Sequence, residues 1–276
     1  MHNGSSLFTG DAGQGESNIR RWIIENDWLE AIIALPLNMF YNTGIATYIW
    51  VLTNRKPEPR KGKVQLIDAT QWFTPLRKNL GKKNCELSEE NISRICDTFL
   101  RFEDTEQSKI FPNATFGYWK VTVERPLRIK GIDPSRVYTS KEIKELKEKG
   151  ERDENAPPVI CKIHKRGTKP EPLQGLFEAT IGGKPCVVEY EPNSELRDTE
   201  QVPLIEEGGI EAFLKREVLP YAPDVWYNTS SVKTGYEISF SRYFYKPQTL
   251  RTLEEIRADI LALEKETEGL LEEILE

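Results

Sequence analysis

The sequence is poor in the residues from which metal sites and disulfides are built. It contains four cysteines and two histidines among 276 residues. A structural zinc site needs four closely spaced ligands of these types. None of the cysteines forms a C-x-x-C pair, so we expect no metal site and ordinary reduced thiols. The residues concerned are Cys85, Cys96, Cys161, Cys186, His2 and His164.

Long apolar runs are absent as well. The longest lie near residues 31–37 and 45–52, whereas a membrane-spanning helix needs about 20 apolar residues. No basic segment followed by an apolar segment comes after Met1, so we expect no secretory signal. The sequence therefore predicts a cytoplasmic protein without a membrane segment.

The common catalytic motifs are also missing. The stretch "GDAGQGES", residues 10–17, lacks the Gly-Lys-Ser/Thr ending of a phosphate loop, and no apolar strand precedes it. No G-x-S-x-G or H-E-x-x-H pattern occurs. We therefore assign no catalytic residue to this chain.

The charge that is present is unevenly distributed. The net charge is −6, and residues 250–276 alone carry nine acids against three bases. Residues 55–83 carry nine bases against two acids. Such a patch is typical of contacts with nucleic-acid phosphates, although a scattered, solvated surface explains it equally well. The bases that we select as candidate phosphate ligands are Arg77, Lys78, Lys82 and Lys83.

Hydrophobic patterning predicts a mixed chain of helices and strands. The runs at 28–36, 45–53 and 63–70 read as strands, the second of them buried, and the first two as neighbours in one sheet. Four helices are expected, at 17–26, 88–102, 140–150 and 210–223. Ser17 is expected to cap the first of them and Ser88 the second. Further strands are expected at 116–129 and 236–245. We also expect a hairpin that turns at Gly182-Gly183 and a loop over 151–175.

The last segment carries a heptad pattern. Apolar residues recur there at alternating spacings of three and four, and Thr252 with Glu255 fits a capping box. One amphipathic helix cannot bury such a seam alone. The seam either folds back on its own domain or packs against another chain, and its acidity favours a protein over a nucleic acid. Its candidate contact residues are Leu253, Ile256, Ile260, Leu263, Leu270 and Ile274.

Two aromatic rings lie in the short link between the first two strands. Phe40 and Tyr41 precede Asn42, Thr43 and Gly44. Enzymes that modify a base in DNA turn it out of the helix and hold it against an aromatic face. From the residues alone, covering the end of the sheet is the favoured role for Phe40 or Tyr41.

The longest informative stretch resembles a known family. "NGSSLFTGDAGQGESNIRRWIIENDWLEAIIALPLNMFYNTGIATYIWVLTNRK" is similar to the modification (M) subunits of type I restriction–modification systems, which are adenine-N6 DNA methyltransferases. "FGYWKVTVERPLR", "VVEYEPNSELRDTEQVPLIEEGGIEAFLKREVLPYAPDVW" and "GYEISFSRYFYKP" look like later parts of such a subunit. The resemblance covers essentially the whole chain.

The resemblance implies roles for several residues. Residues 29–52 would be the last two strands of a Rossmann-like methyltransferase sheet. Phe40, or Tyr41 as the near alternative, would stack on the flipped adenine. Asn42, Thr43 and Gly44 would shape the loop, with Gly44 supplying the permissive backbone. The final helix would dock on the specificity (S) subunit, in a complex that also holds the restriction (R) subunit and double-stranded DNA.

Two motifs of the family do not occur in this sequence. The glycine motif that binds S-adenosylmethionine is missing, and so is the catalytic Asn-Pro-Pro-Phe/Tyr, because the chain has no Asn-Pro pair. We therefore expect a C-terminal portion that works with the upstream N-terminal half of the M subunit, is inactive alone, and binds no S-adenosylmethionine alone.

The expected fold class is an α+β or α/β fragment. Residues 1–130 would form the trailing strands of the methyltransferase sheet, residues 131–248 a mixed α+β extension, and residues 249–276 an amphipathic assembly helix. Two alternatives stay open at this point. The chain could be a catalytically inactive module that binds the S subunit through its C-terminal helix, or an unrelated nucleic-acid-binding protein that uses the basic patch at 55–83.

Overall fold

The computed structural model describes residues 1–245 and 251–275. The chain divides into two compact units, Met1–Phe240 and Ser241–Glu276. The predicted domain limit near residue 130 stays a prediction, and the limit at 248–249 lies outside the described residues. The architecture is mixed α/β with several separate sheets, as the sequence predicts at this coarse level.

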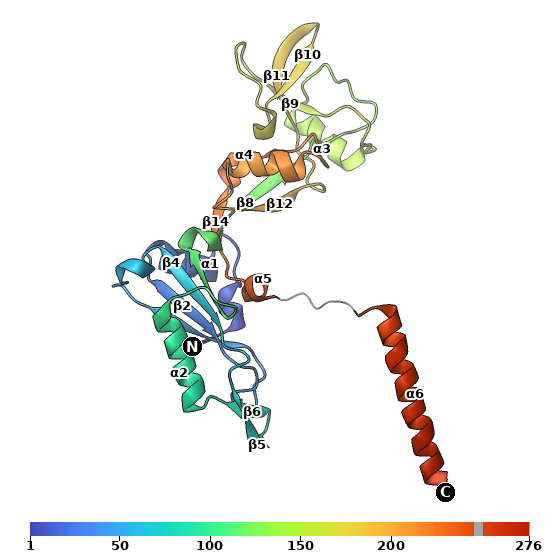
Figure 1. Ribbon diagram of the computed structural model, residues 1–276. Helices are drawn as coiled ribbons and strands as arrows, with labels where there is room; N and C mark the ends of the chain where they lie inside the picture. The colour runs from blue at the N-terminus through green and yellow to red at the C-terminus, as the bar shows by residue number, and fades with distance from the viewer. Residues whose placement is uncertain (246–250, 276) are drawn as a thin grey trace. The chain divides into compact units, whose positions relative to one another are not determined.

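The first unit begins with a five-stranded sheet, which contains β2 and β4 (Figure 1). The order of its strands is β1-β3-β2-β4-β7. Its strands are β1 (His2–Asn3), β2 (Leu29–Ala34), β3 (Thr47–Leu52), β4 (Lys63–Asp68) and β7 (Ser108–Pro112). The predicted pairing of β2 with β3 is confirmed, and it is antiparallel. β4 joins β2 in parallel, and β7 joins β4 antiparallel.

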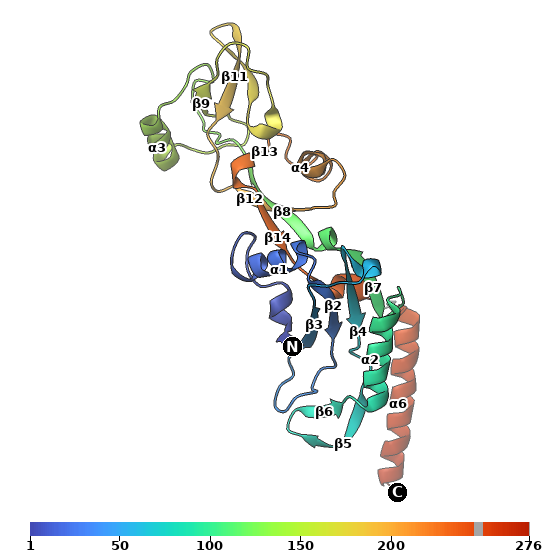
Figure 2. The ribbon, with the colours of Figure 1, turned by 90° about the vertical axis from the view of Figure 1, so that its left-hand side faces the viewer.

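Helix α2 (Glu89–Arg101) covers one face of this sheet (Figure 2). The predicted cap is confirmed, because the Ser88 hydroxyl accepts a hydrogen bond from the backbone N–H of Asn91. Ile95 of the helix packs with Ile33 and Ile67 of the strands in one buried cluster. Burial of this apolar face stabilises the helix far more than its intrinsic propensity does.

Helix α1 (Gly15–Glu25) begins earlier than the sequence predicts. Ser17 is not its cap, because Gln14 occupies that position. The Ser17 side chain is instead buried, and its hydroxyl accepts a hydrogen bond from the backbone N–H of Tyr236 at 3.2 Å. Arg20 makes a second link between the same segments, since its Nε donates to the Tyr236 carbonyl at 2.7 Å. The serine therefore joins distant segments instead of starting the helix.

Strand β3 is less covered than its apolar sequence predicts. Ile49 and Val51 pack against the buried cluster under α2, but the strand as a whole is half-buried. On the side away from β2, its only partners among the described residues are the two of β1, which pair with Thr47 and Tyr48. Among the described residues, Thr47 Oγ1 and Trp50 Nε1 are buried without a hydrogen-bond partner. This edge of the sheet is therefore incomplete in both strand pairing and polar contacts.

A second sheet is built around β8 (Gly117–Glu124), which pairs with β12 (Asp198–Pro203), β13 (Trp226–Tyr227) and β14 (Lys233–Tyr236). The expected strand over 236–245 is wrong. β14 ends at Tyr236, whose partner Gly117 is the first residue of β8. Beyond it, the Glu237 N–H still donates to the Phe116 carbonyl, but the Ile238 N–H donates to the Leu7 carbonyl instead, so the chain leaves the sheet. The chain then forms helix α5 (Phe240–Phe244).

A third sheet has the order β10-β11-β9. Its strands are β9 (Ile160–Ile163), β10 (Phe177–Ile181) and β11 (Lys184–Tyr190). The hairpin that turns at Gly182-Gly183 is confirmed, with Ile181 opposite Lys184. The predicted loop over 151–175 is wrong in part, because it contains β9. The apolar residues of this short strand are too few to stand out between charged neighbours.

The remaining helices follow their sequence signals. Helix α3 (Ser140–Lys149) starts with a capping box formed by Thr139 and Glu142. Helix α4 (Gly209–Phe213) continues as a π-helix over Leu214–Val218. The second unit contains α6 (Leu253–Leu275). Its capping box is present, because the backbone N–H of Thr252 donates to Glu255 and that of Glu255 donates to the Thr252 hydroxyl.

Part of the basic stretch at 55–83 belongs to the core of the first unit. Arg60 is 6% exposed, and its guanidinium lies over the rings of Phe99 and Phe102 at 4.1 and 4.3 Å from their centroids. Its Nε pairs with Glu30 at 3.3 Å. Lys56 likewise pairs with Asp27 at 2.5 Å. Arg60 therefore joins the sheet to α2, Lys56 joins the sheet to the turn after α1, and neither is available to an outside ligand.

We expect Arg60→Ala to lower the free energy of unfolding by about 3 kcal/mol, because it leaves the Glu30 carboxylate buried without its partner. Arg55 is exposed and forms no ion pair among the described residues. Arg55→Ala should therefore change stability by less than about 0.5 kcal/mol. Urea unfolding of both variants measures the difference, and equal stabilities would contradict a structural role for Arg60.

Candidate functional site

The link between β2 and β3 forms a tight turn at residues 40–43. Phe40 and Thr43 face each other as an isolated bridge, and the Thr43 N–H donates to the Phe40 carbonyl at 3.4 Å. Asn42 adopts a left-handed backbone with φ of 52°, which Asn tolerates at the third position of such a turn. Tyr41 is 70% exposed and Phe40 is half-buried. The turn therefore presents one ring to solvent and anchors the other.

Gly44 does not adopt the positive φ that the sequence predicts for it. Gly44 is not among the residues with a positive φ, whereas Asn38 and Asn42 are. A Cβ at Gly44 would lie 3.1 Å from Asn38 Oδ1, so its small size still matters. The two asparagines therefore shape the loop by conformation, and Gly44 shapes it by leaving space.

The sequence prediction missed the hairpin formed by β5 (Thr74–Leu80) and β6 (Lys83–Glu86). Leu80 pairs with Lys83, which leaves Gly81 and Lys82 as a two-residue turn, and Gly81 has a φ of 60°. Gly at the first turn position is a known hairpin signal. The strands themselves are mostly polar and exposed, so hydrophobic alternation could not reveal them.

This hairpin packs against the aromatic turn. A Cβ on Gly81 would lie 2.2 Å from Asn42 Oδ1 and 3.3 Å from Tyr41 Cε2. The backbone N–H of Asn84 donates to the Asn38 carbonyl at 3.1 Å. The Cys85 thiol lies 3.1 Å from the Leu37 carbonyl, and burial raises the pKa of Cys85, so the thiol stays protonated and donates. The structure thus brings together two features that the sequence analysis treated separately.

The basic side chains of the hairpin differ from Lys56 and Arg60, the two buried bases of the 55–83 stretch. Arg77, Lys78 and Lys82 are exposed, and Lys83 is half-buried. Within the part of the chain that the structure describes, none of these four forms a salt bridge, in contrast to Lys56 and Arg60. Four unpaired cations next to an exposed aromatic ring are suited to a ligand that combines a planar group with negative charge.

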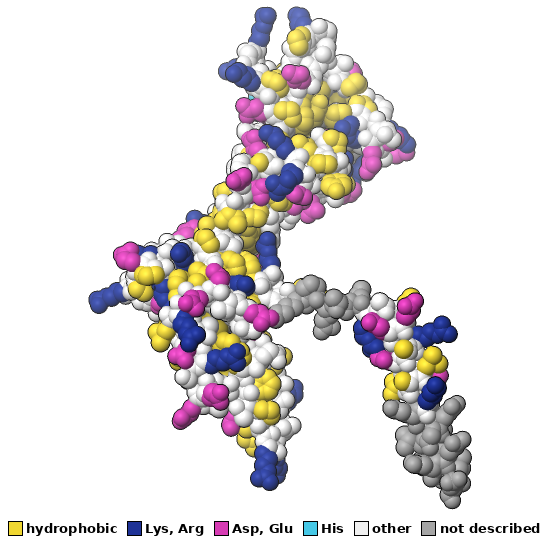
Figure 3. All heavy atoms as spheres, in the orientation of Figure 1, with side chains coloured by type: hydrophobic (Ala, Val, Ile, Leu, Met, Phe, Trp, Pro, Cys, Tyr) yellow, Lys and Arg dark blue, Asp and Glu magenta, His cyan; other side chains and the backbone are white. Residues whose placement is uncertain are grey.

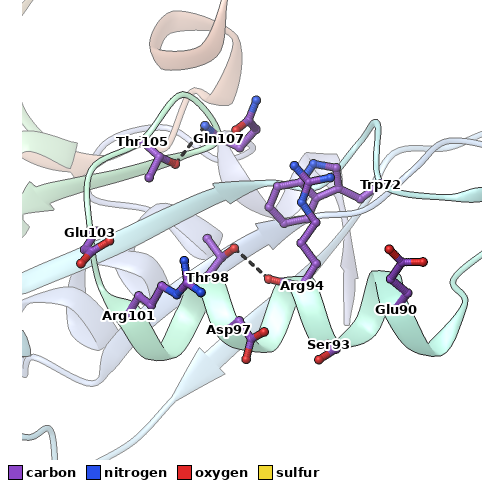
Figure 4. Close-up of a pocket in the computed structure, with 10 residues that line it drawn as sticks. All are labelled: Trp72, Glu90, Ser93, Arg94, Asp97, Thr98, Arg101, Glu103, Thr105 and Gln107. Atoms are coloured by element: carbon purple, nitrogen blue, oxygen red, sulfur yellow. Dashed lines mark hydrogen bonds between the residues drawn. The ribbon is translucent and has the colours of Figure 1, made fainter.

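A hollow beside α2 does not contain the predicted site residues. It has a volume of about 580 Å³ and lies along the outer side of α2 and the segment after it (Figure 4). Arg94 lies over the Trp72 ring at 4.3 Å, and Arg101 projects from the same helix. Glu90, Asp97 and Glu103 add negative charge to the wall. The mixed charge gives it no preference for an anion, so we place the site at the turn and hairpin.

Helix α6 presents part of its apolar seam to solvent. Leu253, Ile260 and Leu263 are exposed by 85%, 53% and 63%, and Ile256 by 40%. The side chains of Leu270 and Ile274 lie outside the described residues. Docking through this seam stays a prediction.

Two general properties follow from the described residues. No group of three or more His, Cys, Asp or Glu side chains there is arranged to hold a metal ion. None of the described helices combines the length and the apolar character that a membrane span requires.

The N-terminal part of the chain matches known proteins. Residues 1–118 match the model of the family described as N-6 DNA methylase. The type I restriction enzyme MjaIX methylase subunit of Methanocaldococcus jannaschii is 39% identical over 95 residues, which cover 34% of this chain and 16% of that protein. The HindI methylase subunit of Haemophilus influenzae is 46% identical over 91 residues, covering 33% and 19%.

The matched segment thus spans about a sixth of the length of these relatives. Among solved structures, the type I restriction-modification methyltransferase subunit of Streptococcus thermophilus superimposes with a TM-score of 0.34 at 26% identity. That superposition covers 41% of this chain and 22% of the other. No argument about the fold follows from so low a score.

We expect Gly81→Ala to separate the hairpin from the turn, because the new methyl group collides with Asn42 and Ala disfavours a φ of 60°. The Asn84 amide should then exchange its hydrogen at least about tenfold faster, since its bond to Asn38 opens more often. Hydrogen exchange followed by NMR measures this rate.

Gly131→Ala is the matched control. Gly131 also has a positive φ, of 75°, but a Cβ there meets no atom within 4 Å. It should leave the exchange of the Asn84 amide unchanged. Equal effects of the two variants would show that the contact between hairpin and turn is not what Gly81 maintains.

Proposed function

We propose that this chain, whose residues 1–118 match the N-6 DNA methylase family, is the target-base portion of a type I restriction–modification methylase subunit. In this proposal the parent enzyme methylates the N6 amine of adenine in double-stranded DNA. The observation that carries the proposal is the contact between the exposed aromatic turn and the unpaired basic hairpin, both within the matched residues.

The aromatic turn supplies the surface on which the flipped adenine stacks. Stacking a base on an aromatic side chain contributes about 1–3 kcal/mol per base. Phe40 is the first candidate, because its ring is half-buried at the turn, and the exposed Tyr41 ring is the second. The bridge between Phe40 and Thr43 fixes the backbone of the turn, and the hairpin lies against Tyr41. A fixed backbone loses less conformational entropy on binding than a free loop.

The hairpin supplies phosphate contacts beside the extruded base. Arg77, Lys78, Lys82 and Lys83 leave their positive charges available, because none of the described carboxylates pairs with them. Each phosphate that such a side chain neutralises releases a counterion and so favours binding. Flanking phosphate contacts fix the position of the duplex without reading its sequence. The hairpin therefore positions the DNA while the turn holds the base.

The methyl donor of the family is S-adenosylmethionine, which supplies an electrophilic methyl group for the adenine amine. The groups that contact the turn are Gly81, Asn84 and Cys85, and none of them offers a carboxylate for ribose hydroxyls. The residues present at this site do not fit the donor. In the proposal, the donor pocket and the Asn-Pro-Pro-Phe/Tyr motif belong to an upstream N-terminal half of the subunit.

The incomplete edge of the first sheet is where that half would join. β3 pairs on its outer side only through Thr47 and Tyr48, and Trp50 Nε1 has no partner among the described residues. An added strand would satisfy the free backbone groups beyond Tyr48 and extend the sheet toward a Rossmann-like arrangement. The half-burial of an apolar strand is consistent with a surface that another segment covers.

The final helix is proposed to dock on the specificity (S) subunit, within a complex that includes the restriction (R) subunit. The exposed residues Leu253, Ile256, Ile260 and Leu263 form the described part of the seam. Leu270 and Ile274 continue it in the sequence. The acidic flanks of the helix would be complemented by a basic surface on the partner.

A second candidate function is a catalytically inactive module that binds the S subunit through α6. The exposure of the α6 seam favours it, because this feature alone needs no methylase half. The two candidates differ in whether Phe40 and the hairpin matter for the interaction with DNA.

In an enzyme reassembled from this chain, the upstream half and the S subunit, we expect Phe40→Ala to lower kcat/KM for DNA methylation roughly 5- to 150-fold. This range corresponds to the loss of about 1–3 kcal/mol of stacking. Phe40→Trp should keep most of the activity, because it retains an aromatic face. A duplex with 2-aminopurine at the target position reports base extrusion directly through its fluorescence.

Tyr41→Ala distinguishes between the two rings. Only the substitution that removes the ring in contact with the base should reduce the change in 2-aminopurine fluorescence. If Phe40→Ala and Tyr41→Ala both leave extrusion and methylation unchanged, the stacking role is wrong and the inactive-module function is favoured.

We expect the double substitution Ile260→Asp and Leu263→Asp to abolish association with the S subunit, because it places two charges in the seam. Ala258→Asp with Ala262→Asp adds the same charges on the other side of the helix and should leave association intact. Size-exclusion chromatography with light scattering measures both complexes. Association that survives the seam substitutions would exclude α6 as the docking element.

A further inference from the structure

A groove of about 1020 Å³ lies in the third sheet, far along the sequence from the aromatic turn. The turn after β9 forms one wall, and the β10–β11 hairpin forms the other. Lys165, Arg166 and Lys184 stand at its rim, together with Gly167 and Thr168. Neither the family match at residues 1–118 nor the proposed function assigns a role to these residues.

The wall after β9 is an ordered turn. The backbone N–H and the hydroxyl of Thr168 both donate to the Lys165 carbonyl, at 3.2 and 2.9 Å. Gly167 has a φ of 97°, which suits glycine and almost no other residue. The backbone N–H of His164 donates to the Val187 carbonyl at 2.8 Å, which ties the turn to β11. The cations at the rim therefore sit on a fixed backbone.

The cations at the rim are available to a ligand. Lys165, Arg166, Lys169 and Lys184 are exposed, and none of them pairs with a carboxylate of the described residues. Lys162 behaves differently, because its ammonium group pairs with Glu189 at 2.8 Å, and Glu189 also contacts His164 at 2.6 Å. Lys and Arg side chains project from this end of the molecule in the space-filling view (Figure 3). Residues 162–187 carry five Lys and Arg against two acids.

The chemistry of the groove favours a chain of phosphates over an acidic protein. Protein interfaces are enriched in aromatic anchors and depleted in lysine. The residues that line this groove include His164 and Glu178 but no Phe, Tyr or Trp, and its apolar part consists of small residues such as Ala179 and Pro185. Phosphate oxygens are bound by Lys and Arg, and the three cations Lys165, Arg166 and Lys184 outnumber Glu178, the one carboxylate that lines the groove.

We propose that this groove binds the phosphate backbone of duplex DNA, as a second contact that is separate in sequence from the β5–β6 hairpin. The choice of DNA as the polymer rests on the proposed function. The binding itself rests on the unpaired cations and the ordered turn. A second contact of this kind raises affinity for any sequence and leaves base recognition to other parts of the enzyme.

The test uses the full chain and a fluorescein-labelled duplex of about 30 base pairs, with fluorescence anisotropy measured over a range of salt concentrations. The variant Lys165→Ala, Arg166→Ala, Lys184→Ala should bind at least about tenfold more weakly at 50 mM salt. The slope of log K against log salt should fall by about 2–3, because up to three phosphate contacts are lost.

The matched control is Lys141→Ala, Lys144→Ala, Lys149→Ala on α3. These lysines are also exposed and unpaired among the described residues, and their removal changes the net charge by the same amount. The control should retain the affinity and the salt slope of the unchanged chain. Equal losses in the two variants would show a general charge effect and would overturn the proposal, as would a groove variant that binds like the unchanged chain.

Folding of each variant is checked by its thermal midpoint, and a groove variant with a lowered midpoint is replaced by the corresponding glutamine variant. Hydrogen exchange of the unchanged chain provides a test without substitution, since duplex DNA should protect the amides of residues 164–168. Absence of that protection would contradict the proposal. A polyglutamate peptide that protects these amides where the duplex does not would assign the groove to an acidic protein instead.

The result of this test can be told apart from the result of testing the proposed function. Groove-dependent DNA binding without methylation in any reassembled enzyme would reject the proposed function and retain the groove. Methylation that depends on Phe40, together with DNA affinity that is independent of Lys165, Arg166 and Lys184, would reject the groove and retain the proposed function.

Discussion

The antiparallel pairing of β2 with β3 is the constraint on which the candidate site depends. It brings Ala34 opposite Tyr48, so the chain between these two residues must reverse direction at the ends of the strands. Phe40 and Tyr41 lie in that reversal, and neither belongs to the buried cluster under α2, against which the neighbouring Met39 packs. The β5–β6 hairpin then closes on the turn through Asn38 and Gly81. One strand pairing thus fixes both an exposed ring and the support behind it.

Positive charge has two separate uses in the same stretch of sequence. Lys56 and Arg60 are buried and paired. Arg60 joins the sheet to the helix that covers it, and Lys56 joins the sheet to the turn after α1. The hairpin bases are exposed and unpaired among the described residues. A buried charge without its partner is strongly destabilising, whereas an exposed charge is available to a ligand at little cost in stability. Burial therefore separates the structural bases from the bases that we assign to DNA.

Features with local causes could be predicted from the sequence. Ser88 and Thr252 cap helices through contacts within one turn, and β2, β3 and β4 carry enough apolar residues to be recognised. Features with distant causes could not. The Ser17 hydroxyl accepts a hydrogen bond from Tyr236, which lies far along the chain. The strand expected over 236–245 does not form, because β14 ends at Tyr236, opposite the first residue of β8. In the candidate site, the aromatic turn was visible in the sequence, but its contact with the polar hairpin was not.

The central claim is that this chain supplies the target-base side of an adenine methylase whose donor side lies in another segment. The most direct measurement is the transfer of a labelled methyl group from S-adenosylmethionine to adenine N6 in DNA, with the S subunit present. Three samples are compared: this chain, an upstream half with the donor and Asn-Pro-Pro-Phe/Tyr motifs, and the two together. We expect transfer only when both are present. Transfer by this chain alone, or full activity of the upstream half without it, would contradict the account.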